Sequence, residues 1–283
     1  MTRALVVPRL LLGARVLSGV TRASRDRMLE LAARYREPES LAVTLSKALD
    51  AGAEGVLCSP SPALRAALTE LKRTVPIAAV LPGLDVRERL DFEPTLEPLL
   101  RRAGAGAPFG ARLRARFLGV GAGGDWARRV PRLVELEAAA VSRAERCAVV
   151  LAAPIADRAL AAGHARLFAR FTDYVRRRFR VPAGIETGNL GTMLGSLAEW
   201  GVTPDFVVGP VNPRGVGMKP DRDATLAMLR RASVPVLASE LCAGGSIALA
   251  EGARFALENG AYGLVPDLAD LDDVPNELKA LAR

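Results

Sequence analysis

The sequence predicts an α/β protein built as a (β/α)₈ barrel, with residues 1–283 in a single domain. Short apolar runs alternate with amphipathic helical segments along the chain. Most of these runs are apolar at nearly every position, which is typical of parallel strands buried on both faces. The chain has 283 residues, which is enough for eight successive βα units. These three observations together favour the barrel.

Eight segments fit the strand pattern. A doubly wound open sheet is the alternative, but it usually carries a GxGxxG motif after its first strand. The segment LGARVLSGVTRAS, residues 12–24, has no such motif, so the barrel is favoured. The predicted strands span residues 10–18, 54–59, 75–81, 147–153, 181–187, 205–211, 234–240 and 261–267.

Helix start and stop residues follow several of these strands. Ser61 with Pro62 predicts the start of one helix. Asn189 is expected to cap the start of another, which Gly201 ends. Ser246 is expected to open a helix after the seventh strand. These start and stop residues therefore agree with a helix after each of these strands.

The connection between the third and fourth strands, about residues 86–146, is much longer than the others. A plain βα unit needs only about thirty residues. This insertion is rich in Arg, Gly and Ala and contains AGAGAPFGARLRAR, residues 103–116. It is either an excursion over the barrel mouth or a mobile surface insert, and its composition favours the insert.

Composition excludes several classes of function. The net charge is +8, but 39 basic residues are interleaved with 31 acidic ones, so no nucleic-acid partner is expected. No segment is apolar for long enough to cross a bilayer, so no membrane association is expected. Three cysteines that lie far apart indicate a reducing, cytoplasmic location. His164, as the only histidine, excludes a Ser-His-Asp triad and a histidine-based metal cluster.

On this pattern of eight βα units the whole chain resembles the aldolase-type TIM-barrel superfamily, without matching a named family. The resemblance implies an active site at the C-terminal ends of the strands, built from the βα loops. It implies no particular chemistry.

Acidic residues are the first candidates at these strand ends. Glu186 and Glu240 end the fifth and seventh strands, and a buried carboxylate must be paired, protonated or bound to metal. Either glutamate could move a proton, and with Asp267 they could form an all-oxygen magnesium site. No other cofactor is expected. The alternative is that each glutamate binds a neighbouring arginine or amide as a structural brace.

Anion-binding groups are the second set of candidates. Gly244, Gly245 and Ser246 follow the seventh strand, where backbone N–H groups at a helix start would attract a phosphate or carboxylate. Alternatively, the glycines only let the helix pack closely. We also expect Asn189 and Asn212 at the mouth to bind substrate.

The loop after the sixth strand carries Arg214 and Lys219. A lysine can form a Schiff base when its pKa is lowered by burial. Because Lys219 lies beyond the strand, we favour an anion clamp with Arg214, and a solvated loop lysine is the alternative.

The leading hypothesis is a lyase, aldolase or isomerase that acts on a small carbonyl substrate through an enolate. The substrate is expected to be anionic, and a phosphorylated compound is one form it could take. A degenerate barrel that binds a metabolite or partner without turnover is the first alternative. The second is an NAD(P)H-dependent aldo/keto-type reductase. That enzyme needs a tyrosine donor, and Tyr35, Tyr174 and Tyr262 do not stand at convincing strand ends. A homo-oligomer is a further expectation.

Overall fold

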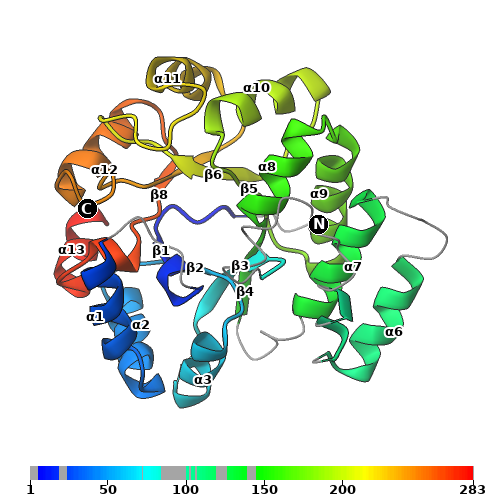
Figure 1. The fold of residues 1–283 in the computed structure, drawn as a ribbon, viewed down its shortest axis with the longest axis horizontal. Helices are drawn as coiled ribbons and strands as arrows, with labels where there is room; N and C mark the ends of the chain where they lie inside the picture. The colour runs from blue at the N-terminus through cyan, green and yellow to red at the C-terminus, as the bar shows by residue number, and fades with distance from the viewer. Residues whose placement is uncertain are drawn as a thin grey trace.

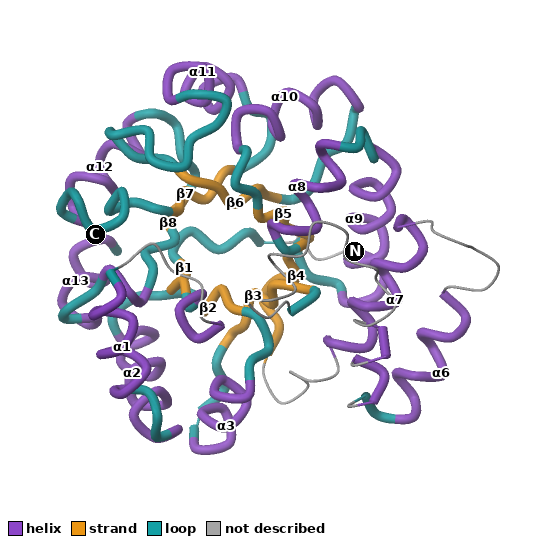
Figure 2. Tube along the Cα trace, in the orientation of Figure 1, coloured by secondary structure: helices purple, strands orange, loops and turns teal. Residues whose placement is uncertain are grey.

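The eight strands of the chain form one parallel sheet in the order β1 to β8, each paired with the next along the sequence. The computed structural model describes residues 6–18, 24–71, 73–83, 100–101, 103–105, 107–118, 126–138 and 145–282. Strands lie at the centre and helices surround them, so the predicted (β/α)₈ barrel is confirmed (Figures 1 and 2).

Each predicted strand overlaps an observed one. The first is much shorter than predicted, because the chain turns into a 3₁₀ helix at Arg15–Ser18 instead of continuing in the sheet. The strands are β1 (Leu11–Gly13), β2 (Gly55–Cys58), β3 (Pro76–Leu81), β4 (Glu145–Leu151), β5 (Ala183–Glu186), β6 (Phe206–Pro210), β7 (Val236–Ser239) and β8 (Gly263–Leu264).

The barrel is closed by contacts between its first and last strands. Parallel bridges join Leu10 to Leu264 and Gly13 to Asp267. The N–H of Leu264 donates to the Arg9 carbonyl at 2.7 Å, and the N–H of Gly13 donates to a carbonyl in the β8 connection at 2.8 Å. The C-terminal ends of β1 and β8 therefore lie side by side.

Helices form the outer layer. The 3₁₀ helix η1 (Arg15–Ser18) follows β1, and a second one, η3 (Leu268–Asp270), follows β8. The α-helices are α1 (Arg25–Arg34), α2 (Pro38–Asp50), α3 (Pro62–Glu70), α6 (Phe109–Leu118), α7 (Trp126–Ala138), α8 (Ala153–Ala161), α9 (Ala165–Phe179), α10 (Leu190–Trp200), α11 (Arg222–Arg231), α12 (Leu249–Glu258) and α13 (Val274–Leu281).

Two apolar cores account for the continuously apolar strands. Alternate strand residues point either to the helices or into the barrel, so both faces are buried. Inside the barrel, Leu57, Val80, Phe206 and Leu237 belong to one cluster. A Cβ on Gly184 would collide with the ring of Phe206, so glycine at this position makes room for the largest side chain of the interior.

The N-terminal end of the barrel is closed by the segment that precedes β1. This segment crosses the barrel as the dark blue trace of Figure 1. The Tyr262 hydroxyl donates to the Val7 carbonyl at 3.3 Å, and the N–H of Arg9 donates to the Glu54 carboxylate at 2.9 Å. The Arg9 guanidinium also lies over the Tyr262 ring.

Three of the four predicted helix boundaries are confirmed and one is wrong. The Ser61 hydroxyl accepts from the N–H of Leu64 at 3.1 Å and caps α3, and Gly201 ends α10 with φ +64°. Asn189 stands at the start of α10, although its side chain makes no capping bond. The helix after β7 begins at Leu249 rather than Ser246. Three consecutive residues, Ala243 to Gly245, have positive φ and keep this stretch in turns.

The described part of the long β3–β4 connection packs outside the barrel. It includes α6, which begins within AGAGAPFGARLRAR and ends two residues beyond it, and α7, which packs beside α9 (Figure 1). The buried Glu135 of α7 accepts hydrogen bonds from Arg114, Tyr174 and Arg178. This network fixes α6 and α9 to α7. The prediction of a surface insert is thus met by these helices, while residues 84–99, 119–125 and 139–144 lie outside the described part.

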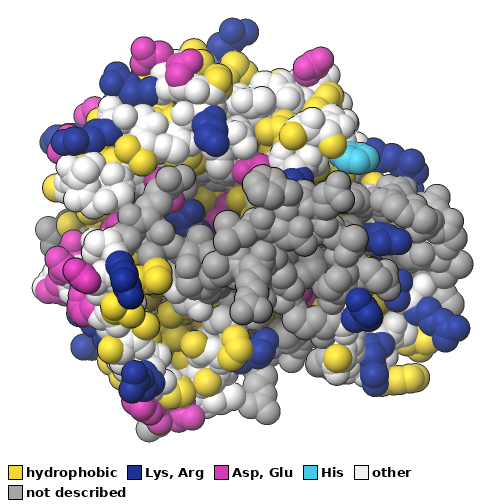
Figure 3. Space-filling view, in the orientation of Figure 1, with side chains coloured by type: hydrophobic (Ala, Val, Ile, Leu, Met, Phe, Trp, Pro, Cys, Tyr) yellow, Lys and Arg dark blue, Asp and Glu magenta, His cyan; other side chains and the backbone are white. Residues whose placement is uncertain are grey.

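Charges of both signs alternate over α1, α11 and α12 on the face shown in Figure 3. The basic run that ends α9 is largely used in ion pairs, because Arg176 binds Asp205 and Arg178 binds Glu135. Among the helices that the structure describes, none has the length and apolar character that a bilayer span requires.

Candidate functional site at the barrel mouth

An arginine that follows β1 joins two acidic residues at the C-terminal end of the barrel. The Arg15 guanidinium contacts the Glu240 carboxylate through Nη2 at 2.8 Å and the Asp267 carboxylate through Nε at 3.4 Å. These residues follow β1, β7 and β8, so parallel topology brings their side chains to one end. Arg15 was expected inside the first strand and was not predicted as a site residue. Because β1 ends at Gly13, Arg15 lies beyond the strand, at the mouth of the barrel.

Burial opposes the positive charge of Arg15, but the carboxylates of Asp267, Glu186 and Glu240 outweigh it and hold its pKa above the usual value. Glu186 ends β5, on another side of the barrel. Its influence on Arg15 therefore indicates that all three acids share the electrostatic environment of the mouth.

A fourth acid, Asp270, stands beside this group in η3. The pKa of Asp270 is raised to about 7, chiefly by burial and also by the charges of Asp267 and Glu240, which outweigh the opposing charges of Arg15 and Arg27. Burial also raises the pKa of Asp267, although Arg15 opposes this shift. A carboxyl with a pKa near neutrality can both donate and accept a proton at physiological pH.

The loop that carries Asp270 is held by Arg27 of α1. The Arg27 guanidinium donates to the carbonyls of Ala269 at 3.1 Å and Leu271 at 2.6 Å, the two residues that flank Asp270. It also forms ion pairs with Glu30 at 2.8 Å and with Asp272 at 2.9 Å. Arg27 thus fixes the backbone on both sides of the acid.

Glu240 is positioned by the loop after β6. The side-chain amide of Asn212 donates to the Glu240 carbonyl at 3.1 Å and to the Val216 carbonyl at 2.9 Å, and its oxygen accepts from the Val216 N–H. Asn212 is fully buried and its amide is used in these bonds. Glu240 itself has φ +54°, a backbone conformation that a non-glycine residue rarely adopts. The predicted substrate ligand Asn212 is therefore placed as a brace of Glu240.

Glu186 and Asn189 lie at the end of β5, as predicted. Glu186 is 5% exposed, and its carboxylate accepts from the N–H of Ala153 at 3.3 Å. The next residues are held by Asp157, which accepts from the Thr187 hydroxyl and from the Gly188 N–H. Asn189 is half-buried beside them.

The predicted anion-binding groups are not gathered at one helix start. Gly244, Gly245 and Ser246 are exposed, and the Ser246 hydroxyl donates to the Ala243 carbonyl. Because α12 begins only at Leu249, these residues do not form the predicted helix N-terminus, and anion binding by them stays a prediction. The alternative role of these glycines was to let a helix pack closely. The glycine that allows α12 to pack closely is Gly252, because a Cβ at that position would collide with the Leu241 carbonyl.

Arg214 and Lys219 are both exposed in the loop between β6 and α11, which lies near α11 at the rim of the barrel (Figure 1). The Lys219 side chain is exposed, whereas a lysine that forms a Schiff base is typically held in a desolvated pocket. Its backbone carbonyl accepts from the N–H of Gly191 at 2.9 Å, which fastens the loop to α10. An anion clamp at the rim stays a prediction.

The predicted magnesium site does not form among the described residues. No group of three or more His, Cys, Asp or Glu side chains in that part of the chain is arranged to hold a metal ion. The reason lies in Arg15, whose guanidinium binds Glu240 and Asp267 and supplies the positive charge that a cation would bring. Glu186 is separately engaged by an amide N–H.

The cysteines and tyrosines do not add to the mouth chemistry. Burial raises the pKa of Cys242 to about 12 and that of Cys58 further, so neither thiol is ionised at neutral pH. Tyr262 binds the Val7 carbonyl at the opposite end of the barrel. Tyr174 binds Glu135 among the outer helices, and Tyr35 ends α1. The tyrosine donor of an aldo/keto-type reductase therefore has no counterpart among the three tyrosines.

Comparison with solved structures finds barrels of similar architecture at low sequence identity. The apo form of Gox0644 aligns with a TM-score of 0.49 and 11% identity over 100% of this chain and 95% of that one. An aldo/keto reductase from Brucella melitensis aligns with a TM-score of 0.47 and 12% identity over 97% of this chain and 88% of that one. The homocysteine methyltransferase MmuM from Escherichia coli, in its apo form, aligns with a TM-score of 0.44 and 13% identity over 97% of this chain and 95% of that one. These likenesses concern the fold alone.

No protein-family model matches the chain, and no curated protein matches it. The function therefore has to be inferred from the residues at the mouth.

Proposed function

We propose that this chain is an enzyme of the lyase or isomerase type that moves a proton on a small carbonyl compound through an enolate. The observation that carries the proposal is the partly buried group at the strand ends, in which Arg15 binds Glu240 and Asp267 beside the near-neutral acid Asp270. Such a combination of a perturbed acid and a fixed positive charge is typical of acid–base sites.

Each residue has a distinct part in the proposed reaction. The Glu186 carboxylate takes the proton from the carbon next to the carbonyl, so the C–H bond breaks and its electrons form the enolate. Asp270 donates its own proton to the carbonyl oxygen, which gives a neutral enol. Arg15, whose charge acts on both acids, stabilises the negative charge that develops on the oxygen before this transfer.

Glu240 and Asp267 orient Arg15 in this scheme. Together with Glu186 and Asp270 they give the described part of the inner mouth four carboxyl groups around the Arg15 guanidinium. An anionic group would be repelled there, so we propose that the reacting end of the substrate is neutral. If the substrate is anionic, as the sequence suggested, its charged end would have to reach Arg214 and Lys219 at the rim.

Exchange of carbon-bound hydrogen for deuterium tests the proposal directly. Dihydroxyacetone, hydroxyacetone and pyruvate would be incubated with the protein in D₂O and followed by proton NMR. We expect accelerated exchange for a neutral ketone and a loss of about a hundredfold or more in Glu186→Gln and Asp270→Asn, since a positioned acid or base contributes that much.

Asp173→Asn is the matched control, because it removes an exposed carboxyl from the outer helix α9. Exchange at the wild-type rate in both Glu186→Gln and Asp270→Asn would contradict the assignment of roles. No exchange above the buffer rate for any compound of the panel would favour the alternative of a barrel that binds without turnover.

A further inference from the structure

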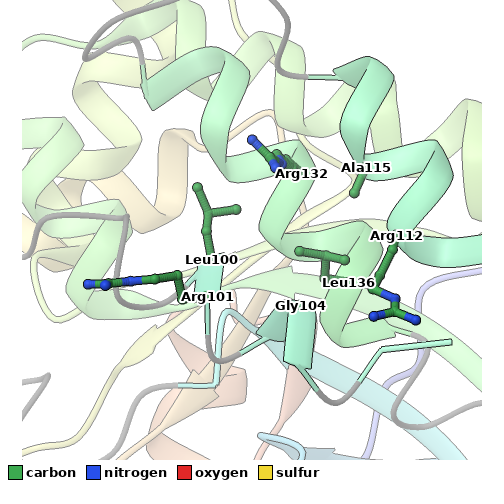
Figure 4. A pocket seen from close by; sticks show the side chains of 7 residues that line it. All are labelled: Leu100, Arg101, Gly104, Arg112, Ala115, Arg132 and Leu136. Carbon is green, nitrogen blue, oxygen red and sulfur yellow. The ribbon is translucent and has the colours of Figure 1, made fainter. Parts of the chain in front are cut away.

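A cavity of about 260 Å³ lies in the long β3–β4 connection, away from the strand ends that form the proposed active site. It is an open cavity lined by helical residues among 100–101 and 103–105, by α6 and by α7 (Figure 4). Its apolar lining comes from Leu100, Ala115 and Leu136. Three arginines complete the wall, one from each helical segment: Arg101, Arg112 and Arg132.

These arginines differ from their neighbours in having no acidic partner. Within the described residues, the side chains of Arg101, Arg112 and Arg132 form neither an ion pair nor a hydrogen bond, and Nε of Arg132 is buried without a partner. By contrast, Arg114 and Arg178 both bind Glu135.

Glu135 cannot serve the cavity arginines as well. Its carboxylate is 2% exposed and already accepts from Arg114, Tyr174 and Arg178. The other acid near the end of α7, Glu137, accepts from the N–H of Gly83 beside β3. A buried guanidinium donor without an acceptor is unfavourable, so the cavity is electrostatically incomplete as it stands.

We propose that this cavity binds a small organic anion. Its apolar body would cover Leu100, Ala115 and Leu136, and an oxygen of its phosphate or carboxylate group would accept from the guanidinium of Arg132. A charged acceptor supplies the counter-charge and the strong hydrogen bond that this arginine lacks. The cavity volume lies just below the usual range for drug-sized ligands, which suits a compound of modest size.

The arrangement of the arginines narrows the ligand further. Their guanidinium groups stand at separate places around the apolar lining and do not meet at one point (Figure 4). A bare phosphate ion could therefore engage only one of them closely, whereas an amphipathic anion uses the lining and one guanidinium together. Basic side chains also gather over α6 and α7 in Figure 3, which attracts anions of any kind to this side.

Isothermal titration calorimetry with phenyl phosphate tests the proposal, with inorganic phosphate and phenol as the charge-only and apolar-only probes. We expect phenyl phosphate to bind at least tenfold more tightly than either, because only it satisfies both parts of the cavity. Arg132→Met should weaken its binding by about tenfold or more. Arg170→Met, which removes an exposed arginine of α9, should leave it unchanged.

Several results would overturn the proposal. These are undiminished binding of phenyl phosphate to folded Arg132→Met, equal binding of inorganic phosphate, and absence of binding at millimolar concentration. If Arg132→Met fails to fold, Arg132→Gln, which also removes the positive charge from the cavity, takes its place. Unchanged affinity there would be equally decisive. Binding of single-stranded RNA without phenyl phosphate would identify a nucleic-acid surface instead.

Discussion

The Arg15 guanidinium lies 2.8 Å from the Glu240 carboxylate, and so an ion pair joins the first βα connection to the end of β7. The two side chains are only 24% and 12% exposed, so each charge depends on the other for compensation. Asp267 contacts the same guanidinium at 3.4 Å, which makes Arg15 the positive centre of an acidic group.

Loss of Arg15 should therefore cost more stability than loss of Glu240. Arg15→Met leaves the neighbouring carboxylates without their counter-charge, and we expect it to lower the free energy of unfolding by about 2–4 kcal/mol. Glu240→Gln also relieves repulsion with Asp267 and Asp270, so its cost should be smaller. Urea unfolding at pH 8 of both variants and of the double variant measures the difference. Equal losses in the two single variants would show that the acids do not repel one another.

Stability should depend on pH through Asp270. Its pKa is raised to about 7 in the folded protein, whereas an unfolded aspartate has an ordinary value near 4. Between these values the folded state binds more protons than the unfolded state, so this group's contribution to stability falls as pH rises from about 4 to about 7. Above this range the carboxylate stays ionised and the loss is complete.

Asp270→Asn mimics the protonated acid and should remove this dependence. We expect the excess of the variant's free energy of unfolding over that of the wild type to grow by on the order of 2–4 kcal/mol between pH 5 and pH 8. Urea unfolding of both proteins at both pH values measures this difference. The contributions of the other titrating groups cancel, because both proteins contain them. Two proteins with parallel stability profiles would refute the raised pKa.

Arg27 should control both the position and the titration of Asp270. Arg27→Met removes two hydrogen bonds to carbonyls and a positive charge that lowers the Asp270 pKa. The Asp270 pKa should then rise, as ¹³C NMR of its side-chain carboxyl would report, and stability should fall by about 1–3 kcal/mol. Arg27→Lys keeps the charge and should restore the pKa in part. A pKa unchanged in Arg27→Met would limit Arg27 to the surface pair with Glu30.

Two helical glycines should respond oppositely to alanine. Gly252 of α12 packs directly on the Leu241 carbonyl, next to Glu240, so Gly252→Ala forces the helix away and should cost several kcal/mol, about 3 or more. Gly195 of α10 has only an ordinary contact with Met228, so Gly195→Ala should gain up to about 1 kcal/mol. Thermal unfolding of both variants distinguishes them. Similar melting temperatures would argue against tight packing at Gly252.

The barrel could be predicted because its strands are buried on both faces and are marked by local residues. Continuous apolar runs and helix caps such as Ser61 act within a few positions of the chain. The predicted start of the helix after β7, at Ser246, was wrong, and the reason is again local in the sequence. Positive φ angles continue from Ala243 through two glycines, and the sequence alone did not show how far that turn extends.

The site was predicted only in part, because its decisive contacts join distant parts of the sequence. Glu186 and Glu240 could be found from their place at strand ends. Arg15 is 225 residues from Glu240, and its role depends on where β1 stops. Asn212 was correctly placed at the mouth, but its buried amide is bonded to the Glu240 carbonyl, a partner that follows from the path of the loop. Strand-end position thus predicts which residues gather, and tertiary packing decides what they bind.

The contacts that close the barrel also constrain its synthesis. β1 leaves the ribosome before the other strands, yet the Gly13 N–H and the Arg9 carbonyl find their hydrogen-bonding partners in residues 264–266. Until that late segment emerges, the nascent sheet has an unpaired edge at each side, and such edges can pair with other chains. We therefore expect ribosome-bound chains truncated before β8 to be more prone to aggregation and more dependent on chaperones than the finished protein.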